Sequence, residues 1–205
     1  MSSLRQQKKE QTRNTLLENG AREIVRVGLA QISIRHICRL SGYTLGAFYA
    51  SFANREAFLL AVMDSFTGKI FASIHELVEK TVQEGISNCR QNLEAWIAKM
   101  HEDRLYSELL CEFAIHARHD ERFRETFSRF MVSWWQNMTQ AVTLLCNGLK
   151  LTPKEPFSTL AMHLSAMWLG LTLQEPLQGA FKEAQPPTFF EDIDRILDAA
   201  ERHSS

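Results

Sequence analysis

One segment of the sequence brings together side chains of the types that bind metal ions. Glu112, His116 and His119 fall on adjacent turns of an expected helix, with His101 not far away in the chain. Imidazole and carboxylate groups bind Zn²⁺ or iron, so a metal site is one interpretation. Histidines three residues apart near a helix end more often cap carbonyl groups or face solvent. We therefore expect no metal and no other cofactor.

Motifs typical of enzymes are missing from the sequence. There is no Gly-rich nucleotide loop, no G-x-S-x-G, no H-E-x-x-H and no E-x-x-H of a di-iron bundle. We predict that the protein is not an enzyme.

The stretch with the most distinctive chemistry is residues 41–58, SGYTLGAFYASFANREAF. The hydroxyl groups of Thr44 and Tyr49 suit phosphate oxygens, and Gly46 leaves space for the close approach of another backbone. Arg55 adds a cation at a helix start, where free N–H groups already favour an anion. These residue types favour contact with a phosphate-bearing partner.

Helices must position these side chains, and capping residues divide residues 12–80 into four of them. We expect a helix from Thr12 to Val27 ended by Gly28, a short one after Ser33 ended by Ser41-Gly42, a third capped by Thr44 with Phe48 and Phe52 inward, and a long one capped by Asn54 and running towards Lys80. Two short helices joined by a Ser-Gly turn are typical of a helix-turn-helix, whose second helix enters the major groove.

Eight residues are therefore predicted to contact DNA. They are Ser33, Arg35, Tyr43, Thr44, Leu45, Gly46, Tyr49 and Arg55. The ordinary alternative is a packed helical corner with a surface aromatic and solvated charges. The charge distribution favours DNA, because residues 1–60 carry nine Lys or Arg against four Glu, whereas residues 61–205 carry 14 basic and 20 acidic groups.

Residues 33–58 resemble the DNA-binding signature of the tetracycline-repressor (TetR) family. The resemblance rests, without a gap, on Ile37, Gly42, Thr44, Gly46, Phe48, Tyr49, Phe52, Arg55 and Glu56. Leu45 stands where a polar or basic residue is common, and it could at most touch a thymine methyl group. The resemblance implies a three-helix DNA-binding domain over residues 1–53 and a helical effector-binding and dimerisation domain over residues 54–205.

Composition agrees with an all-α protein. The chain has 205 residues, is 45% hydrophobic and contains only 9 Gly and 5 Pro. We expect further helices near residues 88–102, 103–118, 121–147, 155–177 and 188–202. The four cysteines are far apart, the N-terminus lacks the apolar run of a signal peptide, and no segment offers about 18 uninterrupted apolar residues for a membrane span. A bacterial cytoplasmic location without membrane contact is therefore expected.

The second region is rich in aromatic and Met side chains, which suit a cavity for a small apolar or aromatic molecule. Candidate lining residues are Phe66, Ile70, Trp96, Met100, Leu109, Glu112, Phe113, Met131, Trp134, Met138 and Trp168. A place in the core is the more common role for each of the apolar ones. Glu94, Glu108 or Glu112 could meet a cationic ligand, although a solvated or salt-bridged helix face is the commoner role.

Residues 157–173, FSTLAMHLSAMWLGLTL, are apolar nearly all round, and the helix predicted after them has one apolar face. Pairing both helices with their copies in a second subunit would cover them; an ordinary buried core helix is the alternative. Interface candidates are Leu160, Leu164, Met167, Leu171, Ile193, Ile196 and Leu197.

The sequence thus predicts a homodimeric transcriptional regulator, most simply a repressor, which binds a palindromic double-stranded operator and is released by a small-molecule effector. A helical carrier or enzyme that has kept a disused helix-turn-helix is the rival hypothesis, and a regulator that activates or has no ligand is a second.

Overall fold

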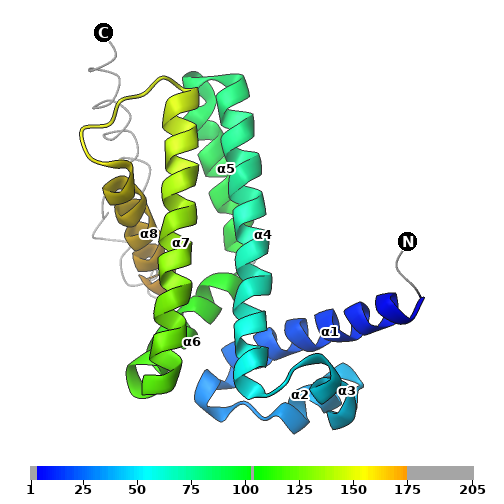
Figure 1. Cartoon of the computed structure of the whole chain (residues 1–205). Coiled ribbons are helices and arrows are strands. Elements are labelled where there is room, and N and C mark those ends of the chain that lie inside the picture. Colours follow the sequence, from blue (N-terminus) through cyan, green and yellow to red (C-terminus); the bar gives the residue numbers. More distant parts are fainter. Residues whose placement is uncertain (1–3, 103, 175–205) are drawn as a thin grey trace. The chain divides into compact units, whose positions relative to one another are not determined.

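The structure is a computed structural model that describes residues 4–102 and 104–174. All regular structure in these ranges is helical, as predicted (Figure 1). The α-helices are α1 (Leu4–Val27), α2 (Ile34–Ser41), α3 (Leu45–Ser51), α4 (Arg55–Glu84), α5 (Cys89–Glu102), α6 (Leu105–His119), α7 (Glu121–Gly148) and α8 (Phe157–Gln174), with the short 3-10 helices η1 (Leu29–Gln31) and η2 (Ile86–Asn88).

Most predicted boundaries agree with these helices to within a few residues. The exception is α1, which begins at Leu4 rather than at Thr12. Residues 4–11 are all exposed and include Arg, Lys, Gln and Glu, which favour a helix without forming an apolar stripe. The helix predicted over residues 188–202 lies outside the described residues.

The chain forms two compact units. The first unit comprises Met1–Lys69 and Leu105–Ser128, and the second comprises Ile70–Arg104 and Arg129–Ser205. The division passes through α4 and α7, so packing groups the first half of α4 with α6 and the three N-terminal helices. The domain boundary between residues 53 and 54 stays a prediction.

The first unit has an aromatic centre. The rings of Phe48, Phe52 and Phe58 lie 5.1–5.2 Å apart between centroids, and Phe48 and Phe58 are fully buried. Gly20 of α1 faces this cluster, since a Cβ there would overlap the Phe58 ring, with two further ring carbons at 3.1 and 3.2 Å. The absent side chain therefore allows α1 to approach α4 closely.

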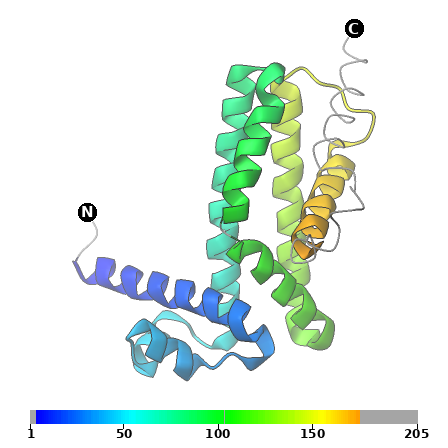
Figure 2. The same ribbon diagram turned by 180° about the vertical axis from the view of Figure 1, so that it is seen from behind.

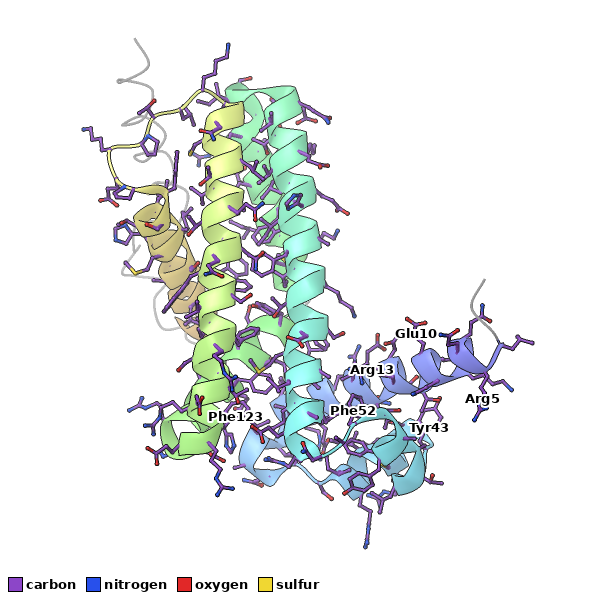
Figure 3. All side chains as sticks on the ribbon, in the orientation of Figure 1. Arg5, Glu10, Arg13, Tyr43, Phe52 and Phe123 are labelled. Carbon is purple, nitrogen blue, oxygen red and sulfur yellow. The ribbon has the colours of Figure 1, made fainter. Side chains whose placement is uncertain are left out.

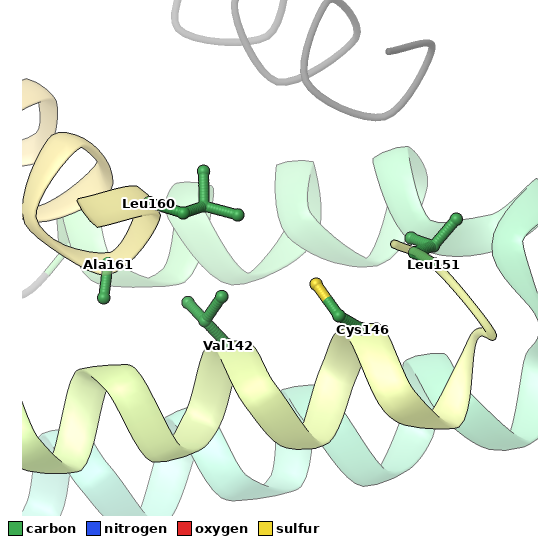
Figure 4. Close-up of a cluster of buried hydrophobic side chains, with 5 residues drawn as sticks. All are labelled: Val142, Cys146, Leu151, Leu160 and Ala161. Atoms are coloured by element: carbon green, nitrogen blue, oxygen red, sulfur yellow. The ribbon is translucent and has the colours of Figure 1, made fainter. Parts of the chain in front are cut away.

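In the second unit, the later parts of α4 and α7 run beside α5 in both views (Figures 1 and 2). Helix α8 packs on α7 through a buried cluster, which Figure 4 shows, formed by Val142, Cys146, Leu151, Leu160 and Ala161.

By length and composition alone, α4 could cross a membrane. Buried core helices meet the same criterion, and Phe58, Leu59 and Val62 of α4 are at most 1% exposed within the first unit.

Candidate nucleic-acid interface

Helix α2 begins and ends at the residues that the sequence indicated. The Ser33 hydroxyl oxygen accepts a hydrogen bond from the backbone N–H of His36 at 3.4 Å. At the other end Gly42 has φ +71°, and its N–H donates to the Arg39 carbonyl at 3.2 Å. The next N–H, of Tyr43, donates to the Cys38 carbonyl at 2.9 Å. This left-handed turn redirects the chain into α3 and favours glycine.

Helix α3 exposes the predicted contact residues at its N-terminal end. Thr44 caps it, since the hydroxyl oxygen accepts from the Ala47 N–H at 3.2 Å. Thr44 is exposed, so the hydroxyl proton can still be donated to a phosphate oxygen. Phe48 points into the core, whereas Tyr49 is 58% exposed with its ring edge-on to Phe48 at 5.3 Å. The motif therefore places a fixed aromatic hydroxyl on the outer face.

Gly46 is also exposed, and its own unit does not require a glycine there. A Cβ at this position would have only ordinary contact, 3.6 Å from the Thr44 hydroxyl oxygen. Gly46 also lies within a helix, where glycine is unfavourable compared with alanine. The packing of the unit itself therefore gives no reason for a glycine at this position.

Helix α1 holds both helices of the motif through side chains that the sequence analysis did not identify. Arg13 donates to the Ser51 carbonyl at the end of α3 at 2.9 Å, and its guanidinium lies 4.5 Å from the centroid of the Phe52 ring. Figure 3 shows Arg13 and Phe52 from α1 and the end of α3. Asn19 donates to the Ser41 hydroxyl at 3.1 Å. Single polar residues in an amphipathic helix carry no local signal of such contacts.

A buried carboxylate organises the contact between α1 and α2. Glu23 is 5% exposed and accepts two hydrogen bonds from Arg26, at 2.7 and 2.8 Å, which lower its pKa, with a smaller contribution from His36. Nε2 of His36 lies 3.3 Å from the same carboxylate, and Nδ1 of His36 lies 2.7 Å from Nη2 of Arg39. With Arg39 as donor, Nδ1 accepts, which places the proton of a neutral His36 on Nε2.

The basic side chains predicted for this region lie on its surface. Arg5, Lys8 and Lys9 of α1 and Arg35 and Arg39 of α2 are exposed, whereas Leu45 and Tyr43 are half-buried. Arg55 is different. It is half-buried, and its Nη2 donates to the Leu29 carbonyl at 2.7 Å. Its contact with phosphate stays a prediction.

The predicted pocket residues are divided between the two units. Phe66, Leu109, Glu112 and Phe113 belong to the first unit; Ile70, Trp96, Met100, Met131, Trp134, Met138 and Trp168 belong to the second. In the second unit Trp96 meets Trp168 at 5.6 Å between ring centroids and donates to the Ser73 hydroxyl at 3.1 Å. This pair is the clearest grouping among the candidates, and their role in a pocket stays a prediction.

The acidic candidates have protein partners or neighbours. Glu94 pairs with Arg90 at 2.9 Å on an exposed face, the ordinary role considered above. Glu112 accepts from the Leu29 N–H at 3.1 Å. Among the described residues no group of three metal-binding side chains comes together, and Nε2 of His116 lies 3.6 Å from an Asp120 carboxylate oxygen instead.

Of the interface candidates, Leu160 is 6% exposed within its own chain, and Leu164 packs against the same cluster. Burial leaves Leu160 little free surface, which favours the core role. Ser158, Met162, His163 and Ala166 form the exposed stripe of α8, and Met167 is half-buried. The side chains of Leu171, Ile193, Ile196 and Leu197 lie outside the described residues.

The sequence matches no protein-family model and no curated protein. Solved structures do match. NemR of E. coli in its reduced form aligns with a TM-score of 0.69 and 19% identity over 92% of this chain and 99% of that one. A TetR-family transcriptional regulator from Rhodococcus sp. gives 0.66 and 17% over 95% and 100%, and another from Syntrophomonas wolfei gives 0.65 and 19% over 95% of each.

These likenesses cover nearly the whole chain, so the protein has the TetR/AcrR fold. The resemblance inferred from residues 33–58 is confirmed at the level of the fold.

Proposed function

We propose that the protein is a transcriptional regulator that binds double-stranded DNA through α3. The observation that carries the proposal is the exposed N-terminal end of α3, where Thr44, Gly46 and Tyr49 present two hydroxyl groups around a position without a side chain. Exposed arginines and lysines of α1 and α2 in the same unit supply the phosphate attraction.

Binding is proposed to require a homodimer. One short recognition helix reads one half-site, and a two-fold pair reads a palindrome. The exposed stripe of α8, with Met162 50% exposed, supports a second copy of this chain as the partner.

A small apolar or aromatic effector that binds best to a dimer arrangement unsuited to DNA would release the protein from its operator, which would make the protein a repressor. The effector would weaken DNA binding by a certain factor, and operator DNA would weaken effector binding by that same factor. The aromatic side chains of the second unit, with Trp96 beside Trp168, support such a ligand. We also propose that the protein is located in the bacterial cytoplasm and has no enzymatic activity.

Fluorescence anisotropy with a labelled duplex tests the DNA contact. Tyr49→Phe removes only the hydroxyl group and should weaken binding about 10-fold, because a hydrogen bond to a charged group contributes about 1.5 kcal/mol. His75→Gln alters an exposed side chain in the second unit and serves as the control. Unchanged affinity of Tyr49→Phe would refute the phosphate contact. If the protein shows no salt-dependent DNA binding, the rival hypothesis of a helical carrier with a disused helix-turn-helix would be favoured.

A further inference from the structure

The peptide groups of Leu29 are bound on both sides by charged side chains. Leu29 is 1% exposed, so its backbone groups have little access to water. Its N–H donates to Oε2 of Glu112 at 3.1 Å, and its carbonyl accepts from Nη2 of Arg55 at 2.7 Å. Both bonds involve an ionised partner, which makes them stronger than bonds between neutral groups.

These bonds lie at the base of the helix-turn-helix. Leu29 precedes the Ser33 cap of α2 by four residues, and Arg55 follows Phe52, the C-terminal cap of α3, by three. The Arg55–Leu29 bond therefore joins the chain that enters the motif to the chain that leaves it. Glu112 adds a third attachment, from α6.

The glycine before Leu29 has the left-handed backbone conformation on which this arrangement depends. Gly28 has φ +84°, which a residue with a side chain rarely adopts, and a Cβ there would lie 3.4 Å from Oε2 of Glu112. The N–H of Gly28 donates to the Ile24 carbonyl at 2.8 Å and so ends α1. The turn thus aims the Leu29 N–H at the carboxylate.

We propose that Arg55 and Glu112 are positioning residues, which hold the base of the helix-turn-helix through the Leu29 backbone, and that Arg55 does not contact a DNA phosphate. The inference rests on the proposed DNA-binding function and departs from the role that the family signature implies for Arg55. Loss of either side chain leaves a buried peptide group without its partner, which frees the start of α2. The phosphate contacts at this end of the motif belong to exposed side chains such as Arg35.

The salt dependence of DNA binding distinguishes the two roles of Arg55. The probe is a labelled duplex that the wild-type protein has enriched from a random pool. Arg35→Gln removes a phosphate contact and should reduce the slope of log K against log salt by about 0.9. Arg55→Gln should weaken binding about 10-fold with an unchanged slope. A slope reduced in Arg55→Gln as in Arg35→Gln would overturn the proposal.

If Arg55→Gln fails to fold, Arg55→Lys replaces it. Lysine keeps the charge but not the geometry of the guanidinium. The proposal expects weaker binding with the wild-type slope, whereas affinity within about twofold of wild type, as a phosphate contact would give, contradicts it.

Glu112 is tested by rescue and against a matched carboxylate. Glu112→Ala should weaken binding of the same duplex about 10-fold, and Glu112→Gln, which keeps an acceptor for the Leu29 N–H, should recover most of the loss. Glu121→Ala removes the same charge from an exposed position in the first unit. Equal affinities for Glu112→Ala and Glu121→Ala would refute the role of Glu112.

Hydrogen exchange tests the attachment without DNA. The Leu29 amide should exchange faster in Glu112→Ala than in wild type, relative to the Gly85 amide of the second unit, which donates to the Thr81 carbonyl. An unchanged Leu29 rate would contradict the attachment itself. If the wild-type protein enriches no DNA but the Leu29 rate responds, the proposed function fails while the attachment stands.

Discussion

Within the described residues, large side chains are buried more completely in the first unit than in the second. Among the nine largest side chains with less than 2% exposure in the part of the chain that the structure describes, eight belong to the first unit: Phe48, Phe58, Leu16, Ile24, Leu29, Ile37, Leu59 and Val62. The ninth, Thr81, is polar and belongs to the second unit. Buried apolar residues of the second unit mostly keep 5–8% exposure.

The difference corresponds to two tasks. A close-packed core has one arrangement, so it can hold Thr44 and Tyr49 in a fixed geometry for a fixed partner. Less complete burial leaves apolar surface that a ligand or a second subunit can cover. This difference between the units is part of the proposed function. Pairs of substitutions, placed in the same unit or one in each unit, can test it.

The largest effect is expected at α8. Leu160→Glu places a charge in the cluster of Figure 4 and should unfold the second unit, since an unpaired buried charge costs several kcal/mol. Met162→Glu alters a side chain that is 50% exposed and should leave the fold intact while converting dimers to monomers. Circular dichroism and sedimentation velocity measure both outcomes. A folded Met162→Glu dimer would exclude this face of α8 from the interface.

Glycine substitutions compare the packing directly. Gly20→Ala forces the Phe58 ring aside and should lower the free energy of unfolding by about 1–3 kcal/mol. Gly68→Ala, where a Cβ would have no neighbour within 4 Å, should raise it by about 0.5–1 kcal/mol.

In the second unit Gly148→Ala meets methyl groups of Val82. Because side chains of the second unit are buried less completely, Gly148→Ala should lower the free energy of unfolding, measured by urea denaturation, by less than Gly20→Ala does. An equal or larger decrease for Gly148→Ala would contradict the difference in packing between the two units.

Local signals explain what the sequence predicted in the first unit. Ser33, Gly42, Thr44 and Asn54 act through neighbours within five residues, and all four cap or turn the chain as expected. Arg55 does not follow such a rule. Its partner Leu29 is 26 residues away and is a backbone group, which no residue pattern marks.

In the second unit the helices could be predicted from periodicity, but the roles of their residues could not. An apolar stripe has the same residue pattern whether it packs against its own chain, a ligand or a second subunit. Leu160 and Met162 illustrate this, because both belong to an apolar segment, yet one is buried and the other is half exposed.

Loss of the α3 cap should have a moderate effect. Thr44→Ala removes the acceptor for the Ala47 N–H and should lower the free energy of unfolding by about 1 kcal/mol. Thr44→Ser keeps the acceptor and should restore stability. A melt in which both variants match wild type would show that the cap does not contribute to stability.

The smallest effect concerns pH. Burial, and then the charge of Arg55, lower the pKa of His116 below 6.5, although Asp120 opposes this. The unfolded chain therefore binds a proton first as pH falls, so stability is full above about pH 6.5 and decreases as pH falls through the lowered pKa. His116→Gln should flatten this part of the profile, whereas His75→Gln, at an exposed position, should not. Equal profiles of stability against pH for wild type and His116→Gln would refute the contribution of His116.

The central claim, that the first unit reads DNA, is tested most directly by selecting the purified protein on random duplex DNA and sequencing what it retains. The account predicts enrichment of a two-fold palindrome and loss of that enrichment when Gly46→Leu fills the space at the outer face of α3. A folded dimer that enriches no sequence at moderate salt would contradict it.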